Sequence, residues 1–270
     1  MGRVEVDGTG TEYRVAGTGR PVILLHGFPD SGWLWRHQVP ALAAAGFQVI
    51  VPDLRGYGRS DKPRAVSAYR LTVIGRDVKA ILADLGLTRA HVVGHDWGAA
   101  LAWQLAALDP GCVDHLVALS AGHPSTFLRT PEQRRRSAYM LLFQVPGLAE
   151  RWLARNDWAM LRDRAAHPDA DAVISRLEAG GSLTSALNWY RANLPPRSWA
   201  APRVRLPPVR APVMGVWSSG DFALTREQMT DSAQNVAGRW RFEYLEGPGH
   251  WLQLEAPGEV NELLLDFLPR

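Results

Sequence analysis

The chain has very little cysteine, little lysine and no long apolar run. Cys112 is the single cysteine among 270 residues, so no internal disulfide can form, and a thiol-rich structural zinc site is not expected. No stretch approaches the roughly 20 apolar residues of a membrane-spanning helix. Met1 to Val6 are polar and charged in the main and do not resemble a secretory signal. We therefore expect a cytoplasmic protein with no membrane partner, stabilised by core packing.

Charge indicates no particular partner. The 30 basic and 27 acidic side chains leave a formal net charge of +3, and only Lys62 and Lys79 are lysines. The basic residues are spread along the chain, and the one run, Arg134 to Arg136, is more typical of a solvated helix face than of a nucleic-acid patch. We expect no nucleic-acid partner. The length and a hydrophobic content of 46% fit one globular core with one insertion.

Short apolar runs alternate with amphipathic stretches over the first 122 residues, which is typical of a sheet with helices on both faces. A hairpin is predicted first, with strands at 4–6 and 11–15 and a turn at Gly8-Thr9-Gly10. Continuous apolar runs indicate buried parallel strands at 22–25, 47–51, 90–93 and 116–119. Apolar residues spaced three and four apart predict helices at 39–45, 71–85 and 99–108.

Strand patterns disappear between residues 125 and 206, where the sequence becomes helical and rich in tryptophan and arginine. This part ends in a proline-dense stretch: Pro195, Pro196, Pro202, Pro207, Pro208 and Pro212. Strands at 213–217 and 240–245 and a helix at 259–268 follow. We therefore predict a core domain at 1–124 and 207–270, interrupted by a helical cap (lid) domain at 125–206.

A strand, the sequence Gly94-His95-Asp96-Trp97-Gly98 and a helix opening with two alanines together have the form of a nucleophile elbow. Glycines two residues before and after Asp96 allow the helix to approach the strand closely. The central residue is an aspartate, where many enzymes have serine. A carboxylate is already ionised at neutral pH, because its reference pKa is about 3.9, and it can attack a saturated carbon directly.

An acid and then a histidine follow the nucleophile along the chain, as in a nucleophile, acid and histidine triad. Asp221 follows the strand at 213–217, and His250 follows the last strand, so both lie at the carboxyl ends of strands, where ligands collect. His26 follows a buried strand at the place of an oxyanion loop. The useful atom there is the backbone N–H of Phe28, and the imidazole is expected to buttress the loop.

A family resemblance rests on four segments: His26-Gly27-Phe28-Pro29-Asp30, the stretch from Asp53 to Pro63, the elbow from Gly94 to Gly98, and Gly249-His250-Trp251. Through them the chain resembles, nearly end to end, the soluble epoxide hydrolases of the α/β-hydrolase fold. The resemblance implies an α/β fold with a mostly parallel eight-stranded sheet flanked by helices, and an inserted cap. The segments Tyr139 to Gln144 and Leu187 to Arg191 are similar to those that supply two ring-opening tyrosines, here Tyr139 and Tyr190.

This resemblance implies an enzyme that converts an epoxide to a vicinal diol through a covalent ester on Asp96, which water activated by His250 and Asp221 then hydrolyses. The backbone N–H groups of Phe28 and Trp97 would form the oxyanion hole. The substrate is expected to be a small hydrophobic epoxide, with no cofactor and no metal. Candidate substrate contacts are Phe28, Pro29, Trp97 and Trp189, with Trp33 and Trp35 as further apolar candidates.

Two alternatives stay open. A haloalkane dehalogenase shares the aspartate elbow followed by tryptophan, but that family commonly has an asparagine in the first loop or a second tryptophan, where this chain has Phe28 and tyrosines in the cap. A non-catalytic binding protein on the same fold is the other alternative, because a fold does not determine a function. Either a monomer or a homodimer is compatible with the sequence, as is a role in detoxification or in biosynthesis.

Overall fold

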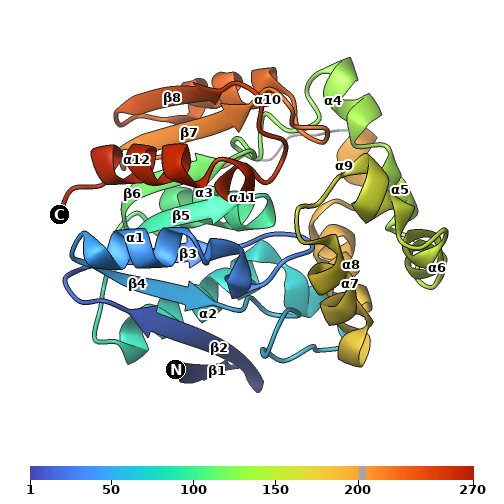
Figure 1. Ribbon diagram of the computed structural model, residues 1–270, viewed down its shortest axis with the longest axis horizontal. Helices are drawn as coiled ribbons and strands as arrows, with labels where there is room; N and C mark the ends of the chain where they lie inside the picture. Colours follow the sequence, from blue (N-terminus) through green and yellow to red (C-terminus); the bar gives the residue numbers. More distant parts are fainter. Residues whose placement is uncertain (201–204) are drawn as a thin grey trace.

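Eight strands form one sheet through the centre of the molecule (Figure 1). The computed structural model describes residues 1–200 and 205–270 and gives the strand order β1-β2-β4-β3-β5-β6-β7-β8. The strands are β1 (Gly2–Val6), β2 (Thr9–Ala16), β3 (Arg20–Leu25), β4 (Phe47–Pro52), β5 (Ala90–His95), β6 (Val113–Leu119), β7 (Val213–Ser218) and β8 (Trp240–Leu245). β2 pairs antiparallel with β1 and β4, whereas the pairs from β4 to β8 are parallel. The predicted mostly parallel, eight-stranded sheet is confirmed.

The hairpin turn lies earlier than predicted. β1 ends at Val6 and β2 begins at Thr9, so the turn consists of Asp7 and Gly8 and the prediction of Gly8-Thr9-Gly10 is wrong. Asp7 and Gly8 have φ angles of 51° and 70°. Two consecutive residues with positive φ give the turn whose twist matches that of a hairpin.

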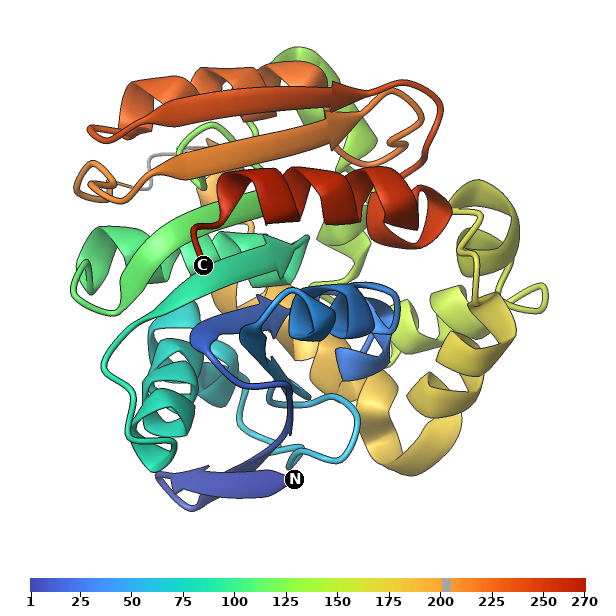
Figure 2. The same ribbon diagram turned by 60° about the vertical axis from the view of Figure 1, so that its left-hand side comes forward.

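Helices cover both faces of the sheet. α2 (Leu71–Asp84) and α3 (Trp97–Leu108) pack on one face, and α1 (Gln38–Ala44) and α12 (Pro257–Phe267) pack on the other, where Figure 2 shows α12 crossing in front of the strands. Successive residues of a strand alternate between the faces. In β3, for example, Val22 and Leu24 join the core beneath α1 and α12, and Ile23 and Leu25 join the core beneath α2 and α3. This double burial explains the uninterrupted apolar runs in the sequence.

A helical segment lies beyond the carboxyl ends of the parallel strands (Figure 1). Its helices are α4 (Pro131–Arg136), α5 (Tyr139–Leu142), α6 (Leu148–Ala154), α7 (Ala170–Glu178), α8 (Ser182–Asn193) and α9 (Arg197–Ala200). They fall within the predicted insertion at 125–206, of which residues 201–204, including Pro202, lie outside the described residues. Two short helices of the core, α10 (Arg226–Thr230) and α11 (Leu252–Glu255), follow β7 and β8. No helix within the described ranges is long and apolar enough to cross a bilayer.

The arginine run at the start of the helical segment is only partly solvated. Arg134 Nε donates a hydrogen bond to the Leu128 carbonyl (2.7 Å), and an Arg136 guanidinium N–H donates to the Asp221 carbonyl (2.8 Å). The prediction of a solvated helix face is confirmed for Arg134 and Arg135, which are exposed, whereas Arg136 is half-buried. An arginine side chain can bind carbonyl oxygens and still lie at the surface, because its donors reach the carbonyls while its stem lies along the surface.

Candidate active site

Asp96 occupies a strained turn between β5 and α3. Its φ and ψ angles are 52° and −120°, a conformation that costs energy in residues other than glycine and that persists where the surroundings fix it. A methyl group at Gly94 would collide with the Gly98 carbonyl oxygen, and one at Gly98 with the Leu25 carbonyl oxygen. The two glycines therefore allow β5 and α3 to approach closely, and the tight turn between them presents the Asp96 side chain at the carboxyl end of β5.

Asp96, His250 and Asp221 come together in the order expected of a triad. His250 Nδ1 lies 3.0 Å from Asp221 Oδ2, and its Nε2 lies 3.8 Å from Asp96 Oδ2. Asp221 is fixed in turn, because its Oδ1 accepts hydrogen bonds from the backbone N–H groups of Ala223 (2.8 Å) and Leu224 (2.9 Å). The imidazole of His250 is thus oriented between two carboxylates.

The charges of the three groups depend on one another. Burial alone would lower the pKa of His250, but the carboxylate of Asp221, its hydrogen bond and the charge of Asp96 raise that pKa to about 9. Burial raises the pKa of Asp96, while His250 and the N–H groups of Trp97 and Phe28 oppose this shift. For Asp221, burial is outweighed by His250 and the two backbone donors, so its pKa is lowered. The shifts of His250 and Asp221 favour a protonated imidazole beside an ionised Asp221 at neutral pH.

One oxygen of Asp96 already faces the predicted oxyanion loop. The Phe28 backbone N–H donates a hydrogen bond to Asp96 Oδ1 at 2.9 Å. His26 fixes this loop, since its Nε2 accepts the Leu54 N–H (2.9 Å), and the proton on its Nδ1 faces the Gly27 carbonyl (3.1 Å). Burial lowers the pKa of His26, so the neutral ring that accepts and donates in this way is favoured. The imidazole buttresses the loop, as the sequence predicted.

His95, next to the candidate nucleophile, points away from it. Its Nε2–H donates to the backbone carbonyl of His250 at 2.9 Å, and the hydroxyl of Ser120 donates to the same oxygen at 3.0 Å. Burial lowers the pKa of His95 to about 3, so the ring is neutral. Both side chains support the loop that presents the His250 ring.

The two predicted tyrosines lie over Asp96 on different helices of the helical segment. Tyr139 begins α5 and Tyr190 lies near the end of α8, and both rings pack against Phe143, with centroids 5.2 Å and 4.9 Å away. Both tyrosines line one cavity together with Asp96 and His250. Burial, and then the negative charge of Asp96, raise the pKa of both hydroxyls far above the ordinary value, so both remain protonated donors.

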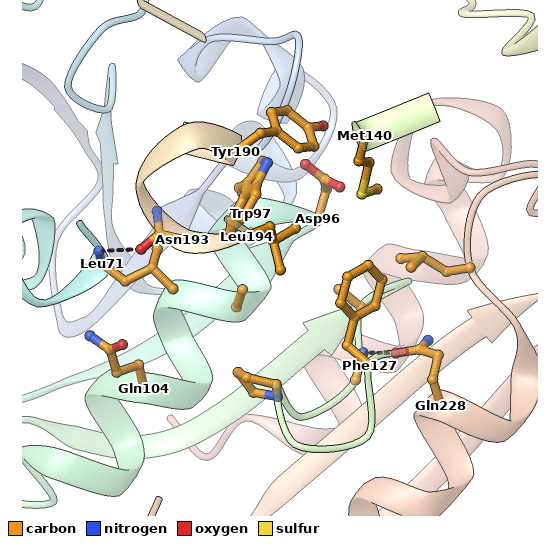
Figure 3. A pocket seen from close by; sticks show the side chains of 15 residues that line it. Leu71, Asp96, Trp97, Gln104, Phe127, Met140, Tyr190, Asn193, Leu194 and Gln228 are labelled. Atoms are coloured by element: carbon orange, nitrogen blue, oxygen red, sulfur yellow. Dashed lines mark hydrogen bonds between the residues drawn. The ribbon is translucent and has the colours of Figure 1, made fainter. Parts of the chain in front are cut away.

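Two cavities of unequal size meet at Asp96. The larger has a volume of about 180 Å³ and extends along α3 (Figure 3). The smaller has a volume of about 30 Å³ and lies toward His250. The residues that line both are Asp96, Met140, Tyr190 and Leu224. The candidate nucleophile therefore stands where a bound molecule would have a large arm on one side and a small one on the other.

The predicted substrate contacts are only partly brought to these cavities. Trp97 lines the larger cavity, and Phe28 and Pro29 line the smaller one. Trp189 does not line either cavity: it is fully buried, and its Nε1–H donates to the Arg55 carbonyl at 3.0 Å. Trp33 and Trp35 are also absent from both cavity walls. Trp33 lies half exposed on the surface, and Trp35 packs in the core beneath α1 and α12.

Sequence reasoning missed two groups of residues. One is the apolar wall of the larger cavity, including Phe127, Met140 and Leu194, which come from separate parts of the chain. The other is Asp30, a buried acceptor. It ends the matching segment His26 to Asp30, and this position could have marked it as a candidate site residue. Within residues 1–200 and 205–270, no group of three or more His, Cys, Asp or Glu side chains is arranged to hold a metal ion.

Comparison with known proteins places this geometry in a family. Residues 20–257 match the family model described as alpha/beta hydrolase fold. Epoxide hydrolase A of Mycobacterium tuberculosis is 34% identical, over 97% of this chain and 96% of the relative. The AB hydrolase superfamily protein YfhM of Bacillus subtilis is 32% identical, with the same coverage. A solved structure of a mutant epoxide hydrolase from Bacillus megaterium, complexed with its naphthyloxy-propanediol product, is 28% identical, has a TM-score of 0.89 and covers 100% of both chains.

The eight-stranded sheet, the aspartate elbow and these similarities over nearly the full length agree with one another. This chain belongs to the α/β-hydrolase fold family and, within it, to the epoxide hydrolases.

Proposed function

We propose that the protein hydrolyses epoxides to vicinal diols through a covalent ester on Asp96. The observation that carries this proposal is the placement of a partly buried carboxylate between a histidine and two tyrosines. Asp96 has His250 on one side, at 3.8 Å, and the hydroxyls of Tyr139 and Tyr190 on the walls of the same cavity. The family membership and the names of the relatives support the same reaction.

In the first step, an Asp96 oxygen attacks a ring carbon of the epoxide, a C–O ester bond forms, and the ring C–O bond breaks. The ring oxygen takes a proton from one tyrosine while the other donates a hydrogen bond to it. Neutral tyrosine hydroxyls are needed for this, which agrees with the raised pKa of both groups. Donors aimed at the oxygen where charge develops lower the barrier, because they require no reorganisation during the step.

In the second step, His250 takes a proton from a water molecule, whose oxygen attacks the carbonyl carbon of the ester. The tetrahedral oxyanion is stabilised by the N–H groups of Phe28 and Trp97. Collapse breaks the bond between this carbon and the diol oxygen, which takes the second proton of the attacking water, and the proton on His250 returns to the tyrosinate. Alkylation removes the Asp96 charge that helps to raise the pKa of His250, so ester formation itself favours the neutral imidazole that can accept a proton from water.

The helical segment at 125–206 would act as a cap over the nucleophile, since it supplies both tyrosines and Met140 to the cavity walls. The unequal cavities favour epoxides with one bulky and one small substituent. The diol bound to the Bacillus megaterium enzyme carries its naphthyloxy group at one end, and it supports aryl glycidyl ethers as first substrates for this chain.

Dehalogenation is the competing reaction for an aspartate nucleophile, and the cap tyrosines are the feature that separates the two. A halide leaves without a proton, whereas an epoxide oxygen requires an acid. The matched assay offers an aryl glycidyl ether and an alkyl halide of similar size and measures diol and halide release. Diol release supports the proposed reaction, and halide release alone would support the dehalogenase. Binding of the ether without release of diol or halide would indicate a non-catalytic binding protein.

The covalent step is tested by a single turnover in heavy-oxygen water. The proposed route places the label in the Asp96 carboxyl group, and the diol carries the former carboxylate oxygen. Direct attack of water on the epoxide would instead label the diol and leave Asp96 unlabelled, and would contradict the proposal. His250→Gln is expected to accumulate the ester, detectable by mass spectrometry, and Asp96→Asn is expected to form none.

A further inference from the structure

Three side-chain amides line the larger cavity, and two of them form hydrogen bonds through both their oxygen and their nitrogen. Asn193 Oδ1 accepts the Leu71 N–H (3.0 Å), and its Nδ2 donates to the Tyr69 and Trp189 carbonyls (2.8 Å each). Gln228 Oε1 accepts the Gly122 N–H (2.6 Å), and its Nε2 donates to the Ser120 carbonyl (2.7 Å). Both amides hold the cavity wall and have little capacity left for a ligand.

Gln104 is the third amide and differs from the other two. In the part of the chain that the structure describes, its side chain has no hydrogen-bond partner, and Figure 3 shows it well away from Asp96 along α3. Asp96 directly precedes α3, Ala100 and Gln104 follow at intervals of four residues, and all three line the same cavity. Eight residues of helix correspond to about 12 Å along the axis.

The wall between these two polar groups is apolar, with Ala100, Phe127, Met140 and Leu194 among its side chains. Asp96 is the one charged residue among the described side chains that line the cavity, so nothing at the far end would compensate a charged ligand group. A neutral group that donates and accepts hydrogen bonds suits an amide best.

We propose that Gln104 is a specificity residue that recognises a neutral hydrogen-bonding group at the far end of the substrate. The preferred substrate class is an epoxide with an extended apolar arm, aryl or alkyl, that ends about 12 Å from the reacting carbon in an amide or hydroxyl. This inference rests on the proposed epoxide hydrolysis at Asp96. It explains why a polar side chain faces a cavity whose neighbouring walls are apolar.

The test compares two substrates of equal shape: the glycidyl ether of para-hydroxyphenylacetamide and that of para-isobutylphenol, in which an isopropyl group replaces the carboxamide. Each is assayed with the wild type and with Gln104→Leu. For the amide, Gln104→Leu is expected to lower kcat/KM about fivefold, mainly through KM, because one hydrogen bond at a distance from the chemistry is lost. For the isobutyl ether, kcat/KM is expected to rise, since leucine needs no hydrogen bond.

Leu194→Met serves as the control. It replaces an apolar wall residue with one of similar volume and should change kcat/KM for both substrates alike. Gln104→Met is the second variant in case the leucine variant folds poorly. Thermal unfolding shows whether each variant is folded. An unchanged ratio of kcat/KM for the two ethers in a folded Gln104 variant would overturn the inference while leaving the proposed function intact. If the wild type released diol from neither ether, the proposed function would fail, and the inference with it.

Discussion

The carboxylate of Asp30 lies 3.2 Å from Nε2 of His167, and both side chains are almost completely buried. Nδ1 of His167 accepts the Asp169 N–H (2.9 Å), so the ring proton is on Nε2 and faces Asp30. Trp251, the residue after His250, also donates its Nε1–H to Asp30 at 3.0 Å. Asp30, at the end of the oxyanion loop segment, is therefore one buried acceptor that contacts both the helical segment, through His167, and the loop that carries His250, through Trp251.

This connection predicts a loss of stability in His167→Ala. Removing a buried donor to a carboxylate is expected to lower the free energy of unfolding by about 2 kcal/mol, because Asp30 stays buried with one fewer partner. Urea denaturation measures the change. The matched control is the exposed histidine His37→Ala, which is expected to change stability by less than about 0.5 kcal/mol. Equal effects of the two substitutions would contradict the assigned role of the His167–Asp30 contact.

The raised pKa of His250 predicts that stability falls at alkaline pH. A folded-state pKa of about 9, above the ordinary value of 6.5, means that the protonated ring stabilises the fold below pH 6.5 and that this contribution disappears as the pH rises through 9. The loss amounts to at most about 3 kcal/mol over this interval. Urea denaturation at pH 6.5 and 9 should show a larger decrease for the wild type than for His250→Gln. An equal decrease in stability of the wild type and His250→Gln between pH 6.5 and 9 would contradict the raised pKa of His250.

Asp221→Asn is expected to separate the two chemical steps. The amide retains an oxygen for the Ala223 and Leu224 N–H groups but no longer stabilises a charged His250, so ester hydrolysis should slow about 10³-fold to 10⁴-fold. Formation of the ester should persist and appear as a stoichiometric burst by mass spectrometry. Glu246→Gln, an exposed acid near the same loop, is the control and should retain steady turnover. A variant that lost ester formation as well would contradict this division of roles.

Tyr139→Phe and Tyr190→Phe are each expected to slow ester formation about a hundredfold, since each removes one donor to the departing oxygen. The rate of the second step should change much less, because neither hydroxyl is proposed to activate water. Rapid-quench measurement of the ester resolves the two rates, and the exposed Tyr244→Phe provides the comparison. Should both tyrosine variants alkylate at the wild-type rate, the tyrosines would be packing residues only.

Trp189→Phe is expected to affect stability and spare substrate binding. The substitution removes the hydrogen bond to the Arg55 carbonyl and leaves a gap in a fully buried site, at a cost of about 2 kcal/mol. KM for an aryl glycidyl ether should stay within about twofold of the wild type. A large increase in KM without loss of stability would restore the sequence-based view that Trp189 contacts the substrate.

The sequence predicted those parts of the site that depend on local pattern and topology. Asp96, Asp221 and His250 each follow a recognisable strand, and parallel strands end at the same edge of a sheet. The tyrosines were predictable only through the family resemblance, because nothing in the pattern around Tyr139 or Tyr190 fixes how the helices lie over the core.

Contacts between segments far apart in the chain were not predictable in this way. The cavity wall around Phe127 and Met140, the His167 contact with Asp30 and the Arg136 contact with the Asp221 carbonyl all depend on how the helical segment docks. The position of Trp189 away from both cavities was not predictable for a related reason, since a tryptophan suits a core and a binding site equally well and the sequence alone does not separate the two.

The difference in volume between the two cavities at Asp96 has a stereochemical consequence. A terminal epoxide with one bulky group can place that group on only one side of the carboxylate, so its two mirror-image forms must present the ring to Asp96 in different orientations. The two forms would therefore differ in how well a ring carbon aligns with the attacking oxygen. The same asymmetry that accommodates a long substrate would therefore make the protein a catalyst for kinetic resolution of racemic epoxides.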